Sequence, residues 1–205
     1  MRTKLEKRCL ELSYENKLSH LSSVLNSVDI IDHIYNTKKK DDVFVLGNSH
    51  AAVALYAVLE KNKLANAQDL VEKHGTHACR DLDNGIWVSG GSLGQAETIA
   101  VGLAIADPTT NVYLLTSDGA CTEGAIWESL GLAREMEVEN LRITVVANGH
   151  GAYSNIDVED LDSRLNAFYP TLVVRTHMFE WPDWLQGTAG HYVVMTKEQY
   201  KEALE

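Results

Sequence analysis

The fold is decided by residues 112–150, which read VYLLTSDGACTEGAIWESLGLAREMEVENLRITVVANGH. Two apolar runs with strand character, 112–116 and 143–147, enclose a segment, 122–136, whose apolar residues recur with helical spacing. A strand, a helix and a second strand in this order predict a right-handed crossover that joins two parallel strands. Neighbouring strands lie about 4.8 Å apart, so the residues that follow them emerge together at one edge of the sheet.

Polar residues follow both strands: Asp118 in a Ser-Asp-Gly turn and Asn148 in an Asn-Gly pair. Open parallel sheets bind ligands at this carboxyl edge. A carboxylate, an amide carbonyl and a backbone carbonyl are hard oxygen ligands that suit Mg²⁺ or Ca²⁺, completed by phosphate oxygens and water. Taken singly, the Asp-Gly pair and the Asn-Gly pair are also ordinary turn signals. At matched strand ends they predict a metal-bound diphosphate, which the start of the helix 122–136 and the backbone N–H of Gly119 would also favour.

The same stretch resembles the thiamine-diphosphate motif, in which Gly-Asp-Gly precedes an Asn by a similar distance; here Ser117 replaces the first glycine. Two further segments are similar to the N-terminal, diphosphate-binding half of transketolase, namely GSLGQAETIAVGLAIA (91–106) and VFVLGNSHAAVALYAVL (43–59). The resemblance spans most of residues 15–150 and continues around 184–205. It implies an α/β fold of three layers, with a mostly parallel central sheet flanked by helices.

The resemblance also implies a set of cofactor contacts. Backbone groups of Gly91 and Leu93 would reach the aminopyrimidine of thiamine diphosphate. The groups implied at its diphosphate are Asp118, Gly119, Asn148 and His150. Of these, Asp118, Asn148 and the backbone carbonyl of His150 would bind Mg²⁺.

Four of the eight histidines fall where the family has active-site imidazoles: His20, His50, His77 and His191. His74 is a rival for the place of His77. Imidazoles suit the implied chemistry because they exchange protons near neutral pH and hydrogen-bond carbonyl and hydroxyl oxygens. The alternative for each is a partly exposed loop histidine.

In this family the glutamate that activates the cofactor belongs to a second domain. The resemblance therefore implies a split enzyme that transfers a two-carbon ketol unit between sugar-like substrates. A separate C-terminal-type, pyrimidine-binding subunit would supply the glutamate in a 2+2 heterotetramer. Glu123 and Glu128 match acids at the family's subunit interface, although acids at a helix start also complement the helix dipole. Two alternatives are the alpha subunit of a 2-oxo-acid dehydrogenase and a non-catalytic paralogue.

Composition sets the remaining limits. With 205 residues, 45% of them hydrophobic, the chain can bury one core, which predicts a single domain over 1–205. A net charge of −11 argues against a nucleic-acid partner. No run is long and apolar enough for a signal peptide or a membrane span. Three scattered cysteines predict a reduced, cytoplasmic setting.

Periodicity and turn signals give the remaining elements. Further strands are expected at 43–46 and 171–176. Further helices are expected at 3–18, 22–36, 50–61, 94–106, 159–167 and 197–205. Residues 62–92 and 177–192 are expected to be irregular.

Overall fold

The computed structural model describes residues 2–151, 153–176 and 181–205. Within these ranges the chain forms two compact units. Unit 1 takes its residues from 1–37, 49–85 and 177–205, and unit 2 from 38–48 and 86–176. That residues 1–205 act as a single domain stays a prediction.

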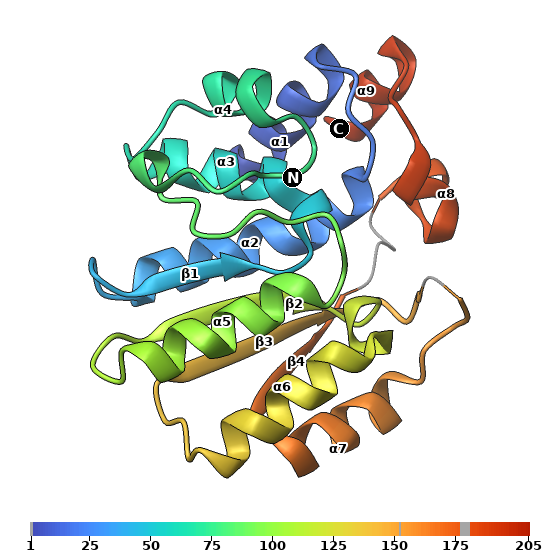
Figure 1. Cartoon of the computed structure of the whole chain (residues 1–205). Coiled ribbons are helices and arrows are strands. Elements are labelled where there is room, and N and C mark those ends of the chain that lie inside the picture. The colour runs from blue at the N-terminus through green and yellow to red at the C-terminus, as the bar shows by residue number, and fades with distance from the viewer. Residues whose placement is uncertain (1, 152, 177–180) are drawn as a thin grey trace. The chain divides into compact units, whose positions relative to one another are not determined.

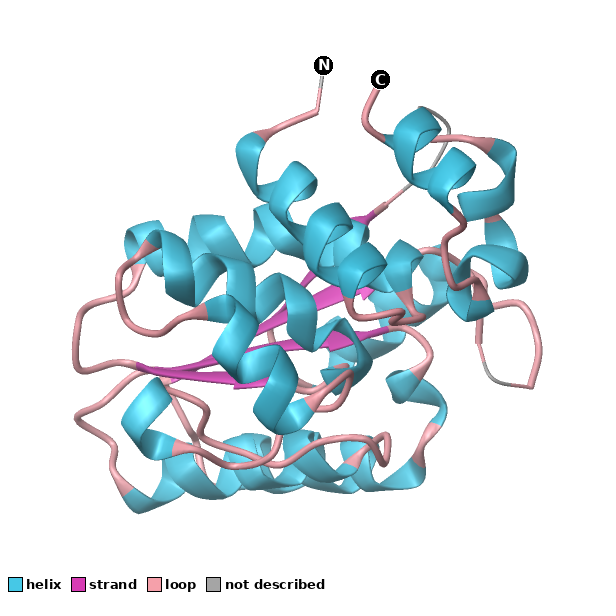
Figure 2. Ribbon diagram, turned by 90° about the horizontal axis from the view of Figure 1, so that it is seen from above, coloured by secondary structure: helices cyan, strands magenta, loops and turns pink. Residues whose placement is uncertain are grey.

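Unit 2 is built on a parallel sheet of four strands in the order β1-β2-β3-β4 (Figure 1). The strands are β1 (Val43–Leu46), β2 (Val112–Ser117), β3 (Leu141–Ala147) and β4 (Thr171–Arg175). Figure 2 shows them side by side in magenta. All three pairings are parallel, and the register places Ser117 of β2 opposite Val146 of β3. The parallel strand pair predicted from residues 112–147 is therefore confirmed.

Helices α5 (Gln95–Ala106), α6 (Gly124–Glu135) and α7 (Val158–Phe168) pack on one face of this sheet. Alternate strand residues such as Val45, Leu114 and Ile143 share a buried apolar cluster with residues of all three helices. Alternation arises because successive strand side chains point to opposite faces. The predicted α/β class, with helices against a parallel sheet, is confirmed.

Unit 1 is helical in the residues described. It contains α1 (Lys4–Glu15), α2 (Leu21–Thr37), α3 (Ala52–Lys61), α4 (Ala67–His74), α8 (Gly187–Tyr192) and α9 (Lys197–Ala203). Helix α3 is buried along most of its length, and α1, α2 and α4 pack against it. Short 3₁₀ turns occur at Ser49–Ala51, Leu82–Asn84 and Asp183–Leu185.

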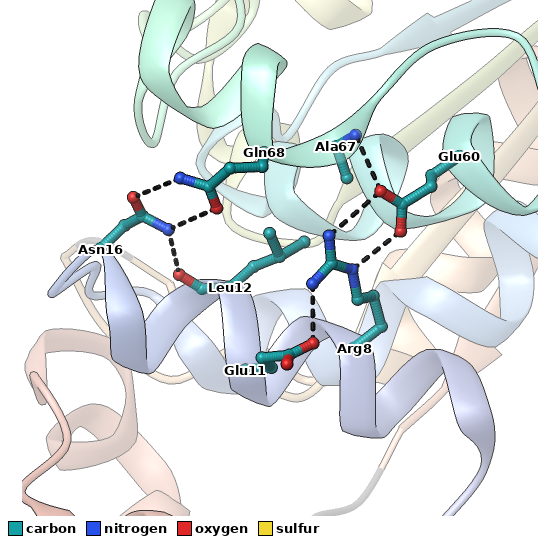
Figure 3. A network of polar contacts seen from close by, with 7 residues as sticks. All are labelled: Arg8, Glu11, Leu12, Asn16, Glu60, Ala67 and Gln68. Atoms are coloured by element: carbon teal, nitrogen blue, oxygen red, sulfur yellow. Dashed lines mark hydrogen bonds and ion pairs between the residues drawn. The ribbon is translucent and has the colours of Figure 1, made fainter.

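A polar network ties α1 to α3 and α4 (Figure 3). The Arg8 guanidinium donates to both carboxylate oxygens of Glu60, at 2.8 and 3.1 Å, and to Glu11 at 2.7 Å. Glu60 also accepts from the backbone N–H of Ala67, the first residue of α4. A bidentate guanidinium–carboxylate pair fixes direction as well as distance, so it sets how α1 lies on α3.

Two expectations about irregular segments were wrong. Helix α4 lies inside 62–92, where Asn66 caps its first turn by accepting from the N–H of Asp69. Leu70 and Val71 bury its apolar side. Helix α8 lies inside 177–192, of which residues 177–180 fall outside the described part. Both helices are short, and their apolar period is too brief to stand out in the sequence.

The ends of the other elements agree with expectation to within a few residues. The largest difference is at α1, which ends at Glu15 and not at residue 18. Helix α6 begins two residues later than expected, at Gly124, after a 3₁₀ turn, Ala120–Thr122. Among the helices of the described ranges, none has the length and apolar character needed to cross a membrane.

Candidate functional site

The turn after β2 and the turn after β3 meet at Asp118. The N–H of Asp118 donates to the Val146 carbonyl at 3.0 Å, which continues the parallel ladder past Ser117. Its carboxylate Oδ2 accepts from the backbone N–H groups of Asn148 at 2.8 Å and Gly149 at 2.7 Å. The two polar residues expected at one sheet edge therefore lie side by side.

Two further side-chain oxygens of this turn, one on Asp118 and one on Asn148, each accept a single hydrogen bond. Asp118 Oδ1 accepts from the N–H of Gly119 at 2.9 Å, and Asn148 Oδ1 accepts from the N–H of His150 at 2.9 Å. A carboxylate or amide oxygen has two lone pairs, so each of these atoms keeps one for a further partner. Because its N–H already donates to Asp118, Gly119 does not turn that donor outward.

Asp118 is only 2% exposed. Burial raises the pKa of its carboxyl, while the N–H groups of Gly149, Gly119 and Asn148 and the charge of His150 act in the opposite direction. A buried carboxylate that keeps an open lone pair is a group that a cation would stabilise.

The third expected ligand atom also lies at this turn. Gly149 has φ +81°, and Ile156 donates its N–H to the Gly149 carbonyl at 2.8 Å, so Ile156 lies beside Gly149. A Cβ built on Gly119 would lie 3.6 Å from the His150 carbonyl oxygen. The carboxylate, the amide and the carbonyl expected to bind Mg²⁺ thus belong to one small region.

In the described part of the chain, no three or more His, Cys, Asp or Glu side chains group together as a metal site. A metal at Asp118 would therefore depend on one carboxylate together with amide and backbone oxygens. Such a set of hard oxygen donors fits Mg²⁺ held through phosphate and water. The metal and cofactor roles of these residues stay predictions.

Ser117 replaces a glycine of the motif without distorting the turn. It is not among the described non-glycine residues with positive φ. Its Oγ accepts from the N–H of Ala120 at 3.2 Å, at the start of the 3₁₀ turn that precedes α6. The serine therefore contributes a hydrogen bond where the motif's glycine has none.

The turn 91–94 needs its glycines. Gly91 has φ +132° and Gly94 has φ +85°, values that L side chains rarely adopt. A Cβ on Gly94 would also lie 2.9 Å from Cβ of Glu123, the residue before α6. Leu93 is half-buried against the core of unit 2. Cofactor contacts by Gly91 and Leu93, and an interface role for Glu123 and the exposed Glu128, are not tested by this geometry.

In unit 1 the four expected histidines form one cluster. The ring centroid of His20 lies 4.4 Å from that of His191, 5.4 Å from His50 and 5.7 Å from His77. His50 and His191 are 5.2 Å apart. These rings come from the start of α2, a 3₁₀ turn, the loop after α4, and α8. Their catalytic role stays a prediction.

Two serines hold the cluster, and sequence reasoning missed both. Ser19 Oγ lies 2.8 Å from His20 Nδ1, and Ser23 Oγ lies 3.3 Å from His191 Nδ1. The N–H of His20 donates to the His191 carbonyl at 2.8 Å. His20 has a backbone φ of +67°, an uncommon value for a residue other than glycine. With Nδ1 engaged, Nε2 is the ring atom left for a ligand. The run LSHLSS at 18–23 was the available signal, because serines beside a histidine can fix its ring.

The cluster disfavours protonation. Burial, with smaller contributions from His191 and neighbouring imidazoles, lowers the pKa of His20 to about 4 and that of His50 to about 3. Burial lowers the pKa of His191 as well. Neutral imidazoles can both donate and accept hydrogen bonds, as recognition of hydroxyl and carbonyl groups requires.

His74, the rival for the place of His77, has a different environment. Its Nε2 lies 3.1 Å from Asp81 Oδ2, and its side chain is only 4% exposed. The same carboxylate accepts from Lys73 and Asn84, which hold the pKa of Asp81 low. His74 thus belongs to a structural network at the end of α4, whereas His77 belongs to the imidazole cluster.

Solved structures share this fold. A transketolase mutant from Pichia stipitis in complex with fructose-6-phosphate aligns with a TM-score of 0.67 at 17% identity, over 98% of this chain and 40% of that chain. No protein-family model matches the sequence. At this identity the likeness shows the fold alone, which is that of part of a transketolase.

The curated relatives are named more specifically. An apulose-4-phosphate transketolase subunit from Phocaeicola vulgatus is 27% identical over 158 residues, which are 67% of this chain and 56% of that protein. The 6-deoxy-6-sulfo-D-fructose transketolase subunit SqwG from Clostridium sp. (strain MSTE9) is 29% identical over 175 residues, 79% of this chain and 60% of that protein. The chain thus matches little more than half of their length. Its homologues are proteins of the transketolase family, and the predicted family is confirmed.

Proposed function

We propose that this chain is the diphosphate-binding subunit of a split transketolase-like enzyme. The observation that carries the proposal is the Asp118 carboxylate, which is buried, bound to the backbone of Asn148 and Gly149, and left with one open lone pair. A partner chain of the C-terminal, pyrimidine-binding type would supply the activating glutamate. Two copies of each chain would form the enzyme, in the cytoplasm.

The residues of the Asp118 turn would hold Mg²⁺ and, through it, thiamine diphosphate. When bound, this cofactor supplies carbanion stabilisation at the carbon of the donor substrate. The chain contributes placement: Asp118 and Asn148 supply side-chain oxygens, and His150 supplies a carbonyl. The fixed backbone hydrogen bonds mean that little reorganisation is needed when the cation binds.

The imidazole cluster would form hydrogen bonds with the oxygens of the substrate and exchange protons with them. Because His20, His50 and His191 are largely neutral at physiological pH, each can donate a hydrogen bond or accept a proton there. A ketose or another sugar-like molecule presents hydroxyl and carbonyl oxygens to such a cluster. The names of two relatives, which specify apulose-4-phosphate and a sulfofructose, support a carbohydrate substrate. Neither compound is assigned to this chain.

Calorimetry with thiamine diphosphate and Mg²⁺ tests the proposal. It is run with the chain alone and with a candidate pyrimidine-binding subunit. We expect Mg²⁺-dependent binding, and two-carbon transfer from a ketose by the complex. Decarboxylation of a 2-oxo acid instead would favour the alpha subunit of a 2-oxo-acid dehydrogenase. No cofactor binding under either condition would favour a non-catalytic paralogue.

A further inference from the structure

Glu97, in the first turn of α5, is a buried acid that the proposed mechanism does not use. It is 2% exposed and lies in unit 2 beside a cavity of about 10 Å³. Apolar residues line most of that cavity, with Val101, Leu114 and Ile126 among them. A space of this size holds at most about one water molecule, so bulk solvent does not reach the carboxyl group.

The contacts of Glu97 join three segments of unit 2. Its Oε1 accepts a short hydrogen bond from the hydroxyl of Thr116, near the end of β2. A Cβ built on Gly47, just after β1, would lie 2.8 Å from Thr116 Oγ1 and closer still to Glu97 Oε1. Gly47 therefore has no room for a side chain, because the Glu97–Thr116 pair packs directly on its backbone. Glu97 itself lies three residues after Gly94, the N-cap of α5.

This carboxyl lacks a compensating cation in the part of the chain that the structure describes. Among the described residues, none of the ion pairs involves Glu97, and its Oε2 has no hydrogen-bond partner. Burial raises the pKa of Glu97, while the Thr116 hydroxyl and the backbone N–H groups of Glu97 and Gly94 act in the opposite direction. One titratable neighbour is the buried Cys121 thiol, which lines the same cavity; its own pKa is raised by burial and by the charges of Glu97 and Asp118, while the charge of Arg164 acts in the opposite direction. An uncompensated buried carboxyl favours its neutral form.

We infer that Glu97, as a neutral carboxylic acid, is a positioning residue that joins the turn 91–94 to the end of β2 and so places Asp118 relative to Gly91 and Leu93. Asp118 follows Thr116 by two residues, so a shift of the hydroxyl moves the proposed metal ligand. Loss of the proton would leave an unpaired charge in an apolar cavity and weaken this link. The role in cofactor binding rests on the proposed function, whereas the protonation and the link are properties of the chain alone.

The first test needs no cofactor. Glutamate side chains are labelled with ¹³C in the full chain, and their carboxyl signals are followed with pH. We expect one signal, absent in Glu97→Gln, to titrate at higher pH than the signal absent in Glu135→Gln, an exposed control on α6. If the two glutamates titrate together, the neutral acid is wrong.

The second test measures the link by amide hydrogen exchange at one pH. Glu97→Leu removes the hydrogen bond but keeps much of the volume, and Glu97→Gln keeps an acceptor for Thr116. We expect Glu97→Leu to speed exchange about tenfold in both 91–95 and 116–119, and Glu97→Gln to restore both segments. Exchange that changes only around residue 97 would overturn the link. If Glu97→Leu does not fold, Thr116→Val removes the same hydrogen bond from the other side.

The third test concerns the site. Affinity for thiamine diphosphate with Mg²⁺ is compared between about pH 6 and about pH 9, a range above the ordinary pKa of a glutamate. We expect the wild-type affinity to fall several-fold towards high pH and that of Glu97→Gln to stay flat. Equal pH profiles would overturn the positioning role. If the wild type binds no cofactor at any pH, either alone or with a candidate pyrimidine-binding subunit, the proposed function fails, and the first two tests still decide the protonation state and the link of Glu97.

Discussion

At Asp118 the geometry is held by backbone hydrogen bonds, whereas the imidazole cluster of unit 1 is held by the packing of helices. The Asp118 carboxylate accepts N–H groups from Gly119, Asn148 and Gly149, within a parallel ladder whose strands are fixed along their length. The four histidines come from separate segments and have two serines as their side-chain anchors among the described residues. The difference suggests that the first region resists perturbation elsewhere in the chain and that the second depends on the whole of unit 1.

The largest effect expected is on cofactor retention, from Asp118→Asn. The amide keeps an oxygen for the N–H groups of Asn148 and Gly149 but removes the charge that Mg²⁺ needs. We expect the affinity for thiamine diphosphate with Mg²⁺ to fall at least about a hundredfold, with the fold retained, as measured by calorimetry and circular dichroism. Asp157→Asn, at the exposed N-cap of α7, is the matched control. Unchanged affinity in Asp118→Asn would move the metal elsewhere.

The opposite pattern is expected for His50→Gln, namely a loss of turnover without a loss of cofactor affinity. Removing an imidazole from the cluster should lower the turnover of the assembled enzyme by about a hundredfold, the usual range for a group that handles protons. Cofactor affinity should stay within about twofold. His33→Gln, on the exposed side of α2, serves as the control. A parallel loss of cofactor affinity in His50→Gln would contradict the separation of the two regions.

The pH dependence of stability sharpens the comparison further. Folding lowers the pKa of His20 from 6.5 to about 4 and that of His50 from 6.5 to about 3. Between these folded and unfolded pKa values the unfolded chain binds more protons than the folded chain. The contribution of His20 and His50 to the free energy of unfolding is therefore complete above pH 6.5 and declines as the pH falls. We expect a slope on the order of 1 kcal/mol per pH unit, after allowing for screening of the partly exposed His20.

Urea unfolding between about pH 7 and about pH 5 measures this slope. His50→Gln should make it shallower, and His33→Gln should leave it unchanged. A wild-type slope equal to that of His50→Gln would show that the cluster does not take up protons on unfolding.

A matched pair of glycine variants on α5 tests how tightly unit 2 is built. Gly94→Ala places a Cβ 2.9 Å from Glu123 Cβ at a φ of +85°, so we expect a loss of about 1–2 kcal/mol in the free energy of unfolding. Gly102→Ala meets nothing within 4 Å and should gain about 0.5–1 kcal/mol. Chemical denaturation gives both values. Equal effects would mean that the turn 91–94 can relax.

A similarly small effect on stability, with none on cofactor affinity, is expected from Ser117→Gly, which restores the residue of the motif. Loss of the hydrogen bond from the Ala120 N–H and the added freedom of glycine should cost about 1 kcal/mol. Cofactor affinity should not change, because neither the Asp118 oxygens nor Asn148 is altered. A clear gain in affinity would show that the serine obstructs the diphosphate.

The geometry of the Asp118 turn could be predicted because it depends only on two consecutive strands and the helix that joins them. Two apolar runs of strand length with a helical period between them specify parallel neighbours, and the residues after neighbouring strands must meet. The imidazole cluster had no such logic. His20, His50, His77 and His191 were singled out only by resemblance, and the choice between His74 and His77 needed coordinates, since both lie in one loop-like stretch of the sequence.

The sequence by itself determined the α/β class, the pairing of β2 with β3, and the meeting of Asp118 with Asn148. Strand and helix periods are local properties of the sequence, and they constrain secondary structure in whichever tertiary context the segment lies. Tertiary structure decided that His20 adopts a positive φ beside His191, that Gly94 packs on Glu123, and that Glu97 is buried without a cation. Each of these depends on which distant segments pack together, and a hydrophobic period carries no information about that.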